Sequence, residues 1–272
     1  MRNIVVAMSS KIERIVKLMD AQREEGKVSF YPSLLCQLSL PMARTSAQLF
    51  LRDSGKVKLK LTSSAELPYG SIPRRILYLM ANHIDGRGIV SWPGSQAKLL
   101  KSMSLGTSGA DVTRLKAQIS ALTRLRITLL RDDKEIFRNE ALLDVVNGQR
   151  FPQFSDAAKL YIMQSLTPVD NRTAIALIQT PFAFDLYVWL TWRSVSLKKP
   201  VTRISWRQLH QQFASCQGLS AFKQHFRRQL SLVALAYPSI IGKVNCETDF
   251  LQLRRYSPHV KARVSSKDNL SI

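Results

Sequence analysis

Two neighbouring stretches, 205–213 and 220–237, carry the strongest helical pattern in the chain and are separated by a short turn. In the second stretch the apolar residues recur at steps of four, four, three and four, and they are Phe222, Phe226, Leu230, Val233 and Tyr237. This spacing puts them on one side of a helix, which Pro238 ends. Ser205 and Ser220 are predicted to cap the two helices. A short helix followed by a strongly amphipathic one is the helix-turn-helix arrangement, so this pair restricts the fold more than any other feature.

The same order of elements is predicted twice along the chain. After the helix pair come two strand-like runs, 240–246 and 250–256, around an acidic turn. In the first half the predicted elements are helices at 73–83, 95–103 and 108–125, then strands at 126–130 and 135–146. Helices followed by a hairpin make a winged helix. We therefore predict a helix-rich α+β fold made of two tandem winged-helix domains.

Further elements are predicted around these two units. Residues 56–61 alternate charged and apolar side chains, which is the period of a half-exposed strand. The other predicted elements are an amphipathic helix within 10–25, a strand at 159–164, a helix at 171–178 and a helix from Thr180-Pro181. Trp189, Trp192 and Trp206 are predicted to be core aromatics. The predicted units are an N-terminal extension at 1–47, a first winged-helix domain at 48–150, a second at 151–260 and a polar tail at 261–272.

The charge balance points to a polyanionic partner. The chain has 40 Lys and Arg residues against 19 Asp and Glu, a formal net charge of +21, and the excess is present in both halves. Such an excess favours a nucleic acid. A ribosome-associated protein, or one that is simply basic, would share it, so charge alone leaves the kind of nucleic acid open.

The cysteines and the apolar runs predict that the chain has no disulfide framework, zinc site, signal sequence or membrane span. Cys36, Cys216 and Cys246 form no Cys-x-x-Cys pair, so neither a disulfide framework nor a zinc site is predicted. The apolar run at 4–8 is too short for a signal sequence, and no run approaches the roughly 20 apolar residues of a membrane span. We expect a soluble cytoplasmic protein without a metal or cofactor.

The outward side of the 220–237 helix carries side chains of the types that read DNA bases. With the apolar stripe inward, a rotation of roughly 100° per residue leaves these residues outward: Ser220, Gln224, Arg227, Arg228 and Ser231. Arg can donate two hydrogen bonds to guanine and Gln can bond bidentately to adenine, while Ser serves either base. Lys223 and His225 lie on the flanks, where phosphates are nearer. An ordinary solvated helix face is the alternative, and the adjoining helix, hairpin and charge favour DNA.

Other cations are predicted to hold the DNA backbone. The hairpin after this helix carries Lys243, Arg254 and Arg255, which suit phosphates or the minor groove. The inward stripe of the 108–125 helix is Val112, Leu115, Ile119 and Leu122. Its opposite face is small or basic and consists of Thr113, Arg114, Ala117, Ser120, Ala121 and Arg124. Small side chains allow a phosphate backbone to approach closely, so both domains are predicted to contact double-stranded DNA.

Enzymatic functions find little support in the sequence. A phosphate-binding loop would end in Gly-Lys followed by Ser or Thr, but Gly55-Lys56 and Gly242-Lys243 are both followed by Val. The spacing His225-x-x-Arg228, with Tyr256 further on, is faintly similar to that of tyrosine recombinases. A DNA strand-transferring enzyme is therefore the alternative from another class, and we predict no catalytic residue.

Several segments resemble the plasmid-encoded RepA family of replication initiators. The segment 67–77, Leu-Pro-Tyr-Gly-Ser-Ile-Pro-Arg-Arg-Ile-Leu, is similar to the one that opens the family's first helix. Further similar segments are 113–118, 181–193, 202–206 and 257–260. They follow the family's order over about residues 30–260, while the 85–94 loop and the first 30 residues depart from it.

The resemblance implies a particular role for the DNA contacts. A member of this family binds directly repeated sequences, or iterons, in a plasmid origin, helps to open an AT-rich region, and recruits host DnaA and the replicative helicase. The resemblance also implies a homodimer that represses its own gene, and hence control of plasmid copy number. A winged-helix transcription regulator is the alternative within the same fold.

Overall fold

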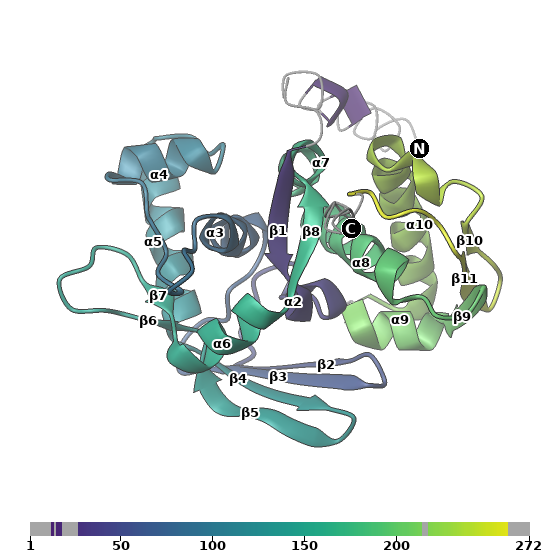
Figure 1. Cartoon of the computed structure of the whole chain (residues 1–272), viewed down its shortest axis with the longest axis horizontal. Coiled ribbons are helices and arrows are strands. Elements are labelled where there is room, and N and C mark those ends of the chain that lie inside the picture. The colour runs from purple at the N-terminus through teal and green to yellow at the C-terminus, as the bar shows by residue number, and fades with distance from the viewer. Residues whose placement is uncertain (1–11, 14, 18–26, 214–216, 261–272) are drawn as a thin grey trace, which may run out of the picture.

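The structure is a computed structural model that describes residues 12–13, 15–17, 27–213 and 217–260 (Figure 1). Within the predicted 10–25 helix, residues 12–13 and 15–17 are helical. The rest of that prediction and the predicted tail at 261–272 lie outside the described residues. The described chain contains both helices and antiparallel strands, in runs of one kind and then the other, which confirms the α+β fold class.

A four-stranded antiparallel sheet and three helices form the first module. Its elements are β2 (Leu49–Asp53), β3 (Val57–Ser63), α3 (Ser71–Asn82), α4 (Gln96–Ser102), α5 (Gly109–Thr123), β4 (Leu125–Arg131) and β5 (Lys134–Ala141). The strands lie in the order β2-β3-β4-β5. β3 buries Val57, Leu59 and Leu61 and exposes the two lysines between them, as its alternating sequence predicts. Three helices before the β4-β5 hairpin give the predicted winged-helix order.

Two serines fix the starts of α4 and α5. Ser95 caps α4 by accepting a hydrogen bond from the Lys98 N–H. Ser108 and Asp111 form a capping box at α5: Asp111 N–H donates to Ser108 Oγ over 3.3 Å, and Ser108 N–H donates to the Asp111 carboxylate over 3.2 Å. Hydrogen bonds from Ser108 and from Arg114 also lower the pKa of Asp111. The first turn of α5 is therefore closed by its own side chains.

Replacing Ser108 by Ala is expected to lower the free energy of unfolding by about 0.5–2 kcal/mol, because the variant removes the acceptor at the start of α5. The midpoint of chemical denaturation measures this loss. Ser91→Ala is the matched control, since Ser91 is exposed and its backbone N–H alone is hydrogen-bonded, to His83 O. Equal losses in the two variants would contradict the capping role.

Two details of these helices differ from the sequence prediction. α3 begins at Ser71, so Pro73 is its third residue instead of its first, which is tolerated because the N–H groups of the first turn need no helical partner. Ala121, predicted on the open face of α5, is buried. The buried side of α5 is wider than its apolar stripe, since Gln118 is also buried and accepts a hydrogen bond from Tyr69 N–H.

The second module is a three-helix unit closed by a three-stranded sheet. Its elements are α8 (Pro181–Ser196), β9 (Val201–Ser205), α9 (Trp206–Phe213), α10 (Leu219–Ala236), η1 (Pro238–Ile240), β10 (Val244–Cys246) and β11 (Phe250–Arg254). The antiparallel order is β10-β11-β9. Trp189 and Trp206 are fully buried, as predicted, and Trp192 is partly buried. The prediction that Ser220 caps α10 is wrong, because the helix begins at Leu219 after Gly218.

Further elements precede and connect the two modules. They are β1 (Val28–Pro32), α2 (Ser33–Gln37), β6 (Leu143–Asp144), β7 (Gln153–Phe154), α6 (Asp156–Gln164), β8 (Leu166–Asp170) and α7 (Asn171–Leu177). The predicted strand at 159–164 is wrong. Those residues belong to α6, since Ser155 caps this helix and Ala158 and Ile162 are buried one turn apart. α6 follows β7, and no strand within 126–164 pairs with a strand of the second module. No described sheet therefore passes from the first module into the second through these residues.

The contact between the modules is built on one buried ion pair. Arg74 of α3 donates to both carboxylate oxygens of Asp185 of α8, over 2.7 and 2.6 Å, and both side chains are almost fully buried. The same guanidinium donates to the carbonyls of Leu40, Pro41 and Gly70. Each of the three guanidinium nitrogens of Arg74 thus donates to an acceptor. A buried charge is tolerated only when it is paired and hydrogen-bonded in this way.

Backbone pairing and one further side-chain hydrogen bond extend this contact. β1, near the N-terminus, pairs antiparallel with β8, and the pair stands between the two modules in Figure 1. Gln212 of α9 donates from Nε2 to the carbonyl of Gln37 at the end of α2 over 2.6 Å. We name this whole contact, formed by the Arg74–Asp185 pair, the β1–β8 pair and the Gln212–Gln37 bond, the module seam.

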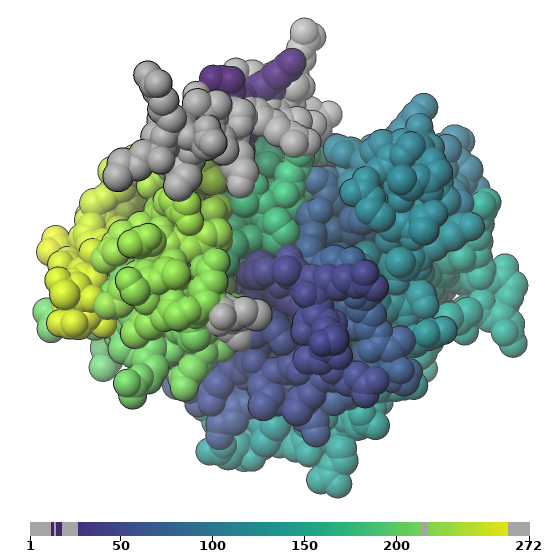
Figure 2. All heavy atoms as spheres, turned by 180° about the vertical axis from the view of Figure 1, so that it is seen from behind, coloured from purple at the N-terminus to yellow at the C-terminus, as the bar shows by residue number. Residues whose placement is uncertain are grey.

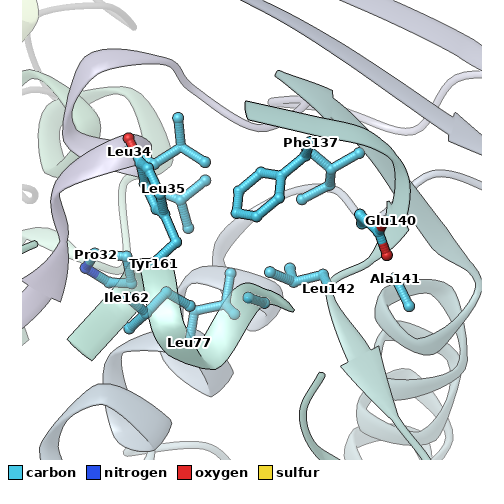
Figure 3. Close-up of a pocket in the computed structure, with 12 residues that line it drawn as sticks. Pro32, Leu34, Leu35, Leu77, Phe137, Glu140, Ala141, Leu142, Tyr161 and Ile162 are labelled. Atoms are coloured by element: carbon cyan, nitrogen blue, oxygen red, sulfur yellow. The ribbon is translucent and has the colours of Figure 1, made fainter. Parts of the chain in front are cut away.

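A small cavity lies where α2, α3, β4, β5 and α6 meet (Figure 3). Its volume is about 20 Å³, and apart from Glu140 at one side its lining is almost wholly apolar. Figure 3 shows Phe137 and Leu142 facing Leu34 and Leu35 across it. A volume close to that of a single water site, without polar partners for a water, marks a gap in packing and not a ligand site.

Candidate nucleic-acid interface

The exposed side of α10 is the face that the sequence predicts. Its exposed residues include Ser220, Gln224, Arg227, Arg228 and Ser231. The buried side packs Phe222 and Phe226 against Trp206 of α9, with ring centroids 6.5 and 5.4 Å apart. Because large aromatic contacts fix the rotation of the helix, the polar face is held outward.

The flanks of α10 are tied to neighbouring elements. Lys223 donates from Nζ to the carbonyl of Thr248 at the β10-β11 turn over 2.8 Å. Arg227 lies over the Trp206 ring, with Cζ 5.5 Å from its centroid. The His225 ring is half-buried and meets Phe182 edge-on at 4.8 Å. Lys223 and His225 were predicted to face phosphates, and the structure instead gives both of them contacts within the module.

Gln224 and Arg228 differ from these flanking residues. Both are exposed, and neither side chain forms a hydrogen bond or ion pair with a residue that the structure describes. Their polar atoms are therefore available to an incoming ligand. A long polar side chain and a guanidinium one turn apart on a projecting helix fit the spacing needed to reach neighbouring base pairs in a major groove.

The predicted backbone-binding cations of the second module gather at the open end of its hairpin. Arg254 N–H donates to Lys243 O over 2.8 Å, so these two exposed residues lie opposite each other where the strands begin and end. Arg255 donates from Nη2 to the carbonyl of Lys198 over 2.7 Å, which brings it to the same place. The tip of the hairpin carries Glu247 and Asp249 instead.

The two ends of this hairpin flank the two ends of α10. The acidic tip is next to Lys223, and the basic end is near the C-terminus of the helix, since η1 leads from Tyr237 directly to Lys243. From Lys223 to Tyr237 an α-helix advances about 21 Å, which is comparable to the width of a DNA duplex. The structure therefore places a cationic end, not a cationic tip, beside the polar helix face.

Four of the residues predicted on the open face of α5 are exposed, namely Thr113, Arg114, Ala117 and Arg124. Thr113 donates from Oγ1 to the carbonyl of Gly109, and Arg114 forms an ion pair with Asp111. The side chain of Arg124, at the C-terminal end, has no hydrogen bond or ion pair to a described residue. Sequence reasoning missed Lys116, which is exposed on the same helix. Its position one step from the apolar stripe was the available signal.

Tyr256 lies in the core of the second module. Its hydroxyl donates to the carbonyl of Leu190 over 2.7 Å, and burial raises its pKa well above the ordinary value. A nucleophilic tyrosine needs an accessible hydroxyl whose proton can leave. The geometry of Tyr256 thus speaks against the strand-transferring alternative at this residue.

Comparison with known proteins gives a likeness of shape only. No family model matches the chain, and no curated sequence matches it. Two crystal structures of domains 2 and 3 of RctB resemble it, each at 14% sequence identity. The first has a TM-score of 0.37 and covers 73% of this chain and 82% of that chain. The second, a selenomethionine derivative, has a TM-score of 0.43 and covers 82% of this chain and 98% of that chain.

None of the helices that the structure describes is both long enough and apolar enough to cross a bilayer.

Proposed function

We propose that this chain is a plasmid replication initiator that binds repeated double-stranded DNA sequences at an origin. The observation that carries the DNA-binding part is the exposed face of α10, where Gln224 and Arg228 are held outward without partners among the described residues. The net charge of +21 supports a polyanionic ligand. The initiator part rests on the resemblance of the 67–77 segment and four further segments to the RepA family.

In this proposal the two modules act on the same duplex. α10 lies in the major groove and reads bases, and the basic end of the β10-β11 hairpin contacts phosphates. α5 gives the first module a second, sequence-tolerant contact. Two linked contacts bind more tightly than either alone, because the second contact is made at high effective concentration. No group in the proposal breaks or forms a covalent bond, so the chain is proposed to be a binding protein without cofactor.

Replication of a plasmid tests the initiator role directly. A circular DNA that carries only this gene, its flanking sequences and a selectable marker is expected to be maintained in a bacterial host, and to be lost when the flanking sequences are scrambled. The transcription-regulator alternative predicts no maintenance, together with repression of a reporter placed behind the same flanking DNA. Dependence on host DnaA and helicase is proposed on the resemblance alone and is tested by repeating the assay in conditional host mutants.

Lys243→Ala and Arg254→Ala are each expected to make the salt dependence of DNA binding shallower. Each phosphate contact contributes about 0.9 to the slope of log Kobs against log salt concentration, so each variant should lower the slope by about one unit on specific and unrelated duplexes alike. Fluorescence anisotropy at several salt concentrations measures the slopes. Arg138→Ala, an exposed cation on β5 that is paired with Glu135, serves as the control of equal charge. If the control lowers the slope as much, the hairpin end is not a specific phosphate contact.

A further inference from the structure

The hairpin beside α5 is not the one that the sequence predicts as a wing. The β4-β5 hairpin turns at Asp132 and Asp133. Its tip is bound to the start of β3 through the hydrogen bond from Asp132 N–H to the carbonyl of Lys56, just before the strand, and through the Lys58–Asp133 ion pair. From the end of α5, β4 runs through seven residues to this tip, a distance of about 20 Å. An acidic tip at that distance from the exposed face of α5 is poorly placed to hold the backbone of a duplex bound there.

A second hairpin, residues 145–152 between β6 and β7, lies next to α5 instead. It projects from the molecule at the side of α5 in Figure 1, and the teal spheres of this part of the chain project at the edge of Figure 2. All residues from 144 to 150 are exposed, with Val145 at 73%. A hydrogen bond from Gln149 N–H to Val146 O closes its tight turn, where Gly148 has a φ of 79°. That left-handed conformation favours glycine.

The base of this hairpin is fixed to the first module. The buried Gln153 side chain bonds the Val90 backbone in both directions, accepting from its N–H over 2.7 Å and donating to its carbonyl over 3.1 Å. Trp92 donates from Nε1 to Pro152 O over 2.9 Å, and its ring lies 5.2 Å from that of Phe151. The hairpin therefore projects from a rigid base, which is what a wing requires.

A cleft of about 450 Å³ separates the 145–152 hairpin from α4 and α5. Its polar and basic lining includes Gln96, Lys116, Thr123, Gln149 and Arg150. Lys116 comes from α5 and Arg150 from the hairpin, so two cations stand on opposite walls. None of the described residues that line the cleft is acidic, and neither cation forms an ion pair with a described residue. Such a cleft would attract one anionic strand between two positive walls.

We propose that the 145–152 hairpin is the wing of the first module and that its cleft takes the sugar–phosphate backbone of duplex DNA. This inference rests on the proposed function of the chain as a protein that binds double-stranded DNA. Lys116 and Arg150 contact phosphates of one strand from opposite sides, and the exposed face of α5 meets the adjacent major groove. Phe151 is half-buried between Arg150 and Trp92, so no aromatic face is offered to unstacked bases, and this favours a duplex over a single strand.

The test measures binding of the full chain to a random-sequence duplex of about 30 base pairs and to one of its single strands, over a range of salt concentrations. Lys116→Ala and Arg150→Ala are each expected to lower the duplex salt slope by about 0.9, and the double variant by about twice that. Lys134→Ala, an exposed cation on the β4-β5 hairpin, is the matched control and is expected to leave the slope unchanged. Unchanged thermal denaturation of the variants shows that folding is intact, since both side chains lie outside the core.

The outcomes separate this inference from the proposed function. If the wild-type chain binds no duplex, the proposed function fails and the wing fails with it. If the wild type binds, and Arg228→Ala loses sequence preference while Lys116→Ala and Arg150→Ala keep the wild-type slope, only the wing is wrong. If Lys134→Ala lowered the salt slope as much, the effect of the cleft cations would be one of overall charge, and the wing assignment would be overturned. A loss confined to the single strand would assign the cleft to opened DNA and overturn the duplex assignment.

Discussion

Replacing Arg228 by Ala is expected to weaken binding to the preferred duplex by about 1–3 kcal/mol, or about 5- to 150-fold, while binding to unrelated DNA changes little. Gln224→Ala is expected to act in the same direction. Both side chains project from the exposed face of α10 without partners among the described residues, so neither loss disturbs the module itself. A bidentate contact to a base edge is made only with the right base, and its loss therefore falls on the specific complex.

The preferred duplex is obtained by repeated selection from a library of random-sequence duplexes with the full chain. Binding of each variant to the selected duplex and to a scrambled one then gives the two affinities, at one fixed salt concentration. Ser239→Ala, an exposed substitution in η1 at the far end of α10, provides the control. Should Arg228→Ala lower both affinities equally, α10 lies along the backbone and its assignment to the major groove is wrong.

Replacing Asp185 by Ala is expected to lower the free energy of unfolding by about 3–5 kcal/mol. The variant leaves the guanidinium of Arg74 charged and buried at 0% side-chain exposure, with only carbonyl acceptors. The cost is that of an uncompensated buried charge, and it is far larger than the net contribution of an intact pair, because desolvation offsets much of the attraction. Urea denaturation measures it, and the transition is expected to become less cooperative as the two modules separate.

A double variant, Arg74→Met with Asp185→Leu, distinguishes a buried charge from a lost contact. Apolar replacement of both partners removes the unpaired charge, so part of the lost stability should return. The return should be incomplete, because the carbonyls of Leu40, Pro41 and Gly70 lose their donor. A loss under about 1 kcal/mol in Asp185→Ala would contradict the role given to this pair.

The periodic parts of the fold could be predicted from the sequence, and its connections could not. α10 was predicted closely because five apolar residues at helical spacing and a terminal proline indicate the same helix. α6 was mistaken for a strand because its apolar residues within 159–164 are too few to distinguish the helical period of about 3.6 residues from the strand period of two. The signal that decides for a helix is the Ser155 cap, which lies before this run. β1 and β9 were missed since short strands take their stability from partners distant in the sequence.

The outward residues of α10 could be predicted from the sequence, but the contacts of its flanking residues with neighbouring elements could not. Helical rotation alone identifies which side chains of α10 point outward, and all five predicted residues are exposed. The contact of Lys223 with Thr248 depends on how the hairpin folds back, and that of Arg227 with Trp206 depends on how α9 packs on α10, which no local pattern contains. The cleft with Lys116 and Arg150 likewise needs α5 and a hairpin brought together by Gln153.

The module seam has a consequence for the spacing of the DNA sites. A buried bidentate ion pair joins the two modules directly, and the β1–β8 strand pair and the Gln212–Gln37 bond support the contact through the connecting elements, so α5 and α10 keep one mutual distance. A pair of sites on a duplex rotates once about the axis every 10–10.5 base pairs. A frame with a fixed distance between its two helices can therefore meet both sites only in one helical phase. Half a turn of added DNA between the sites would bring one of them to the opposite side of the duplex. Because the module seam fixes α5 and α10 relative to each other, the protein could then bind only one of the two sites.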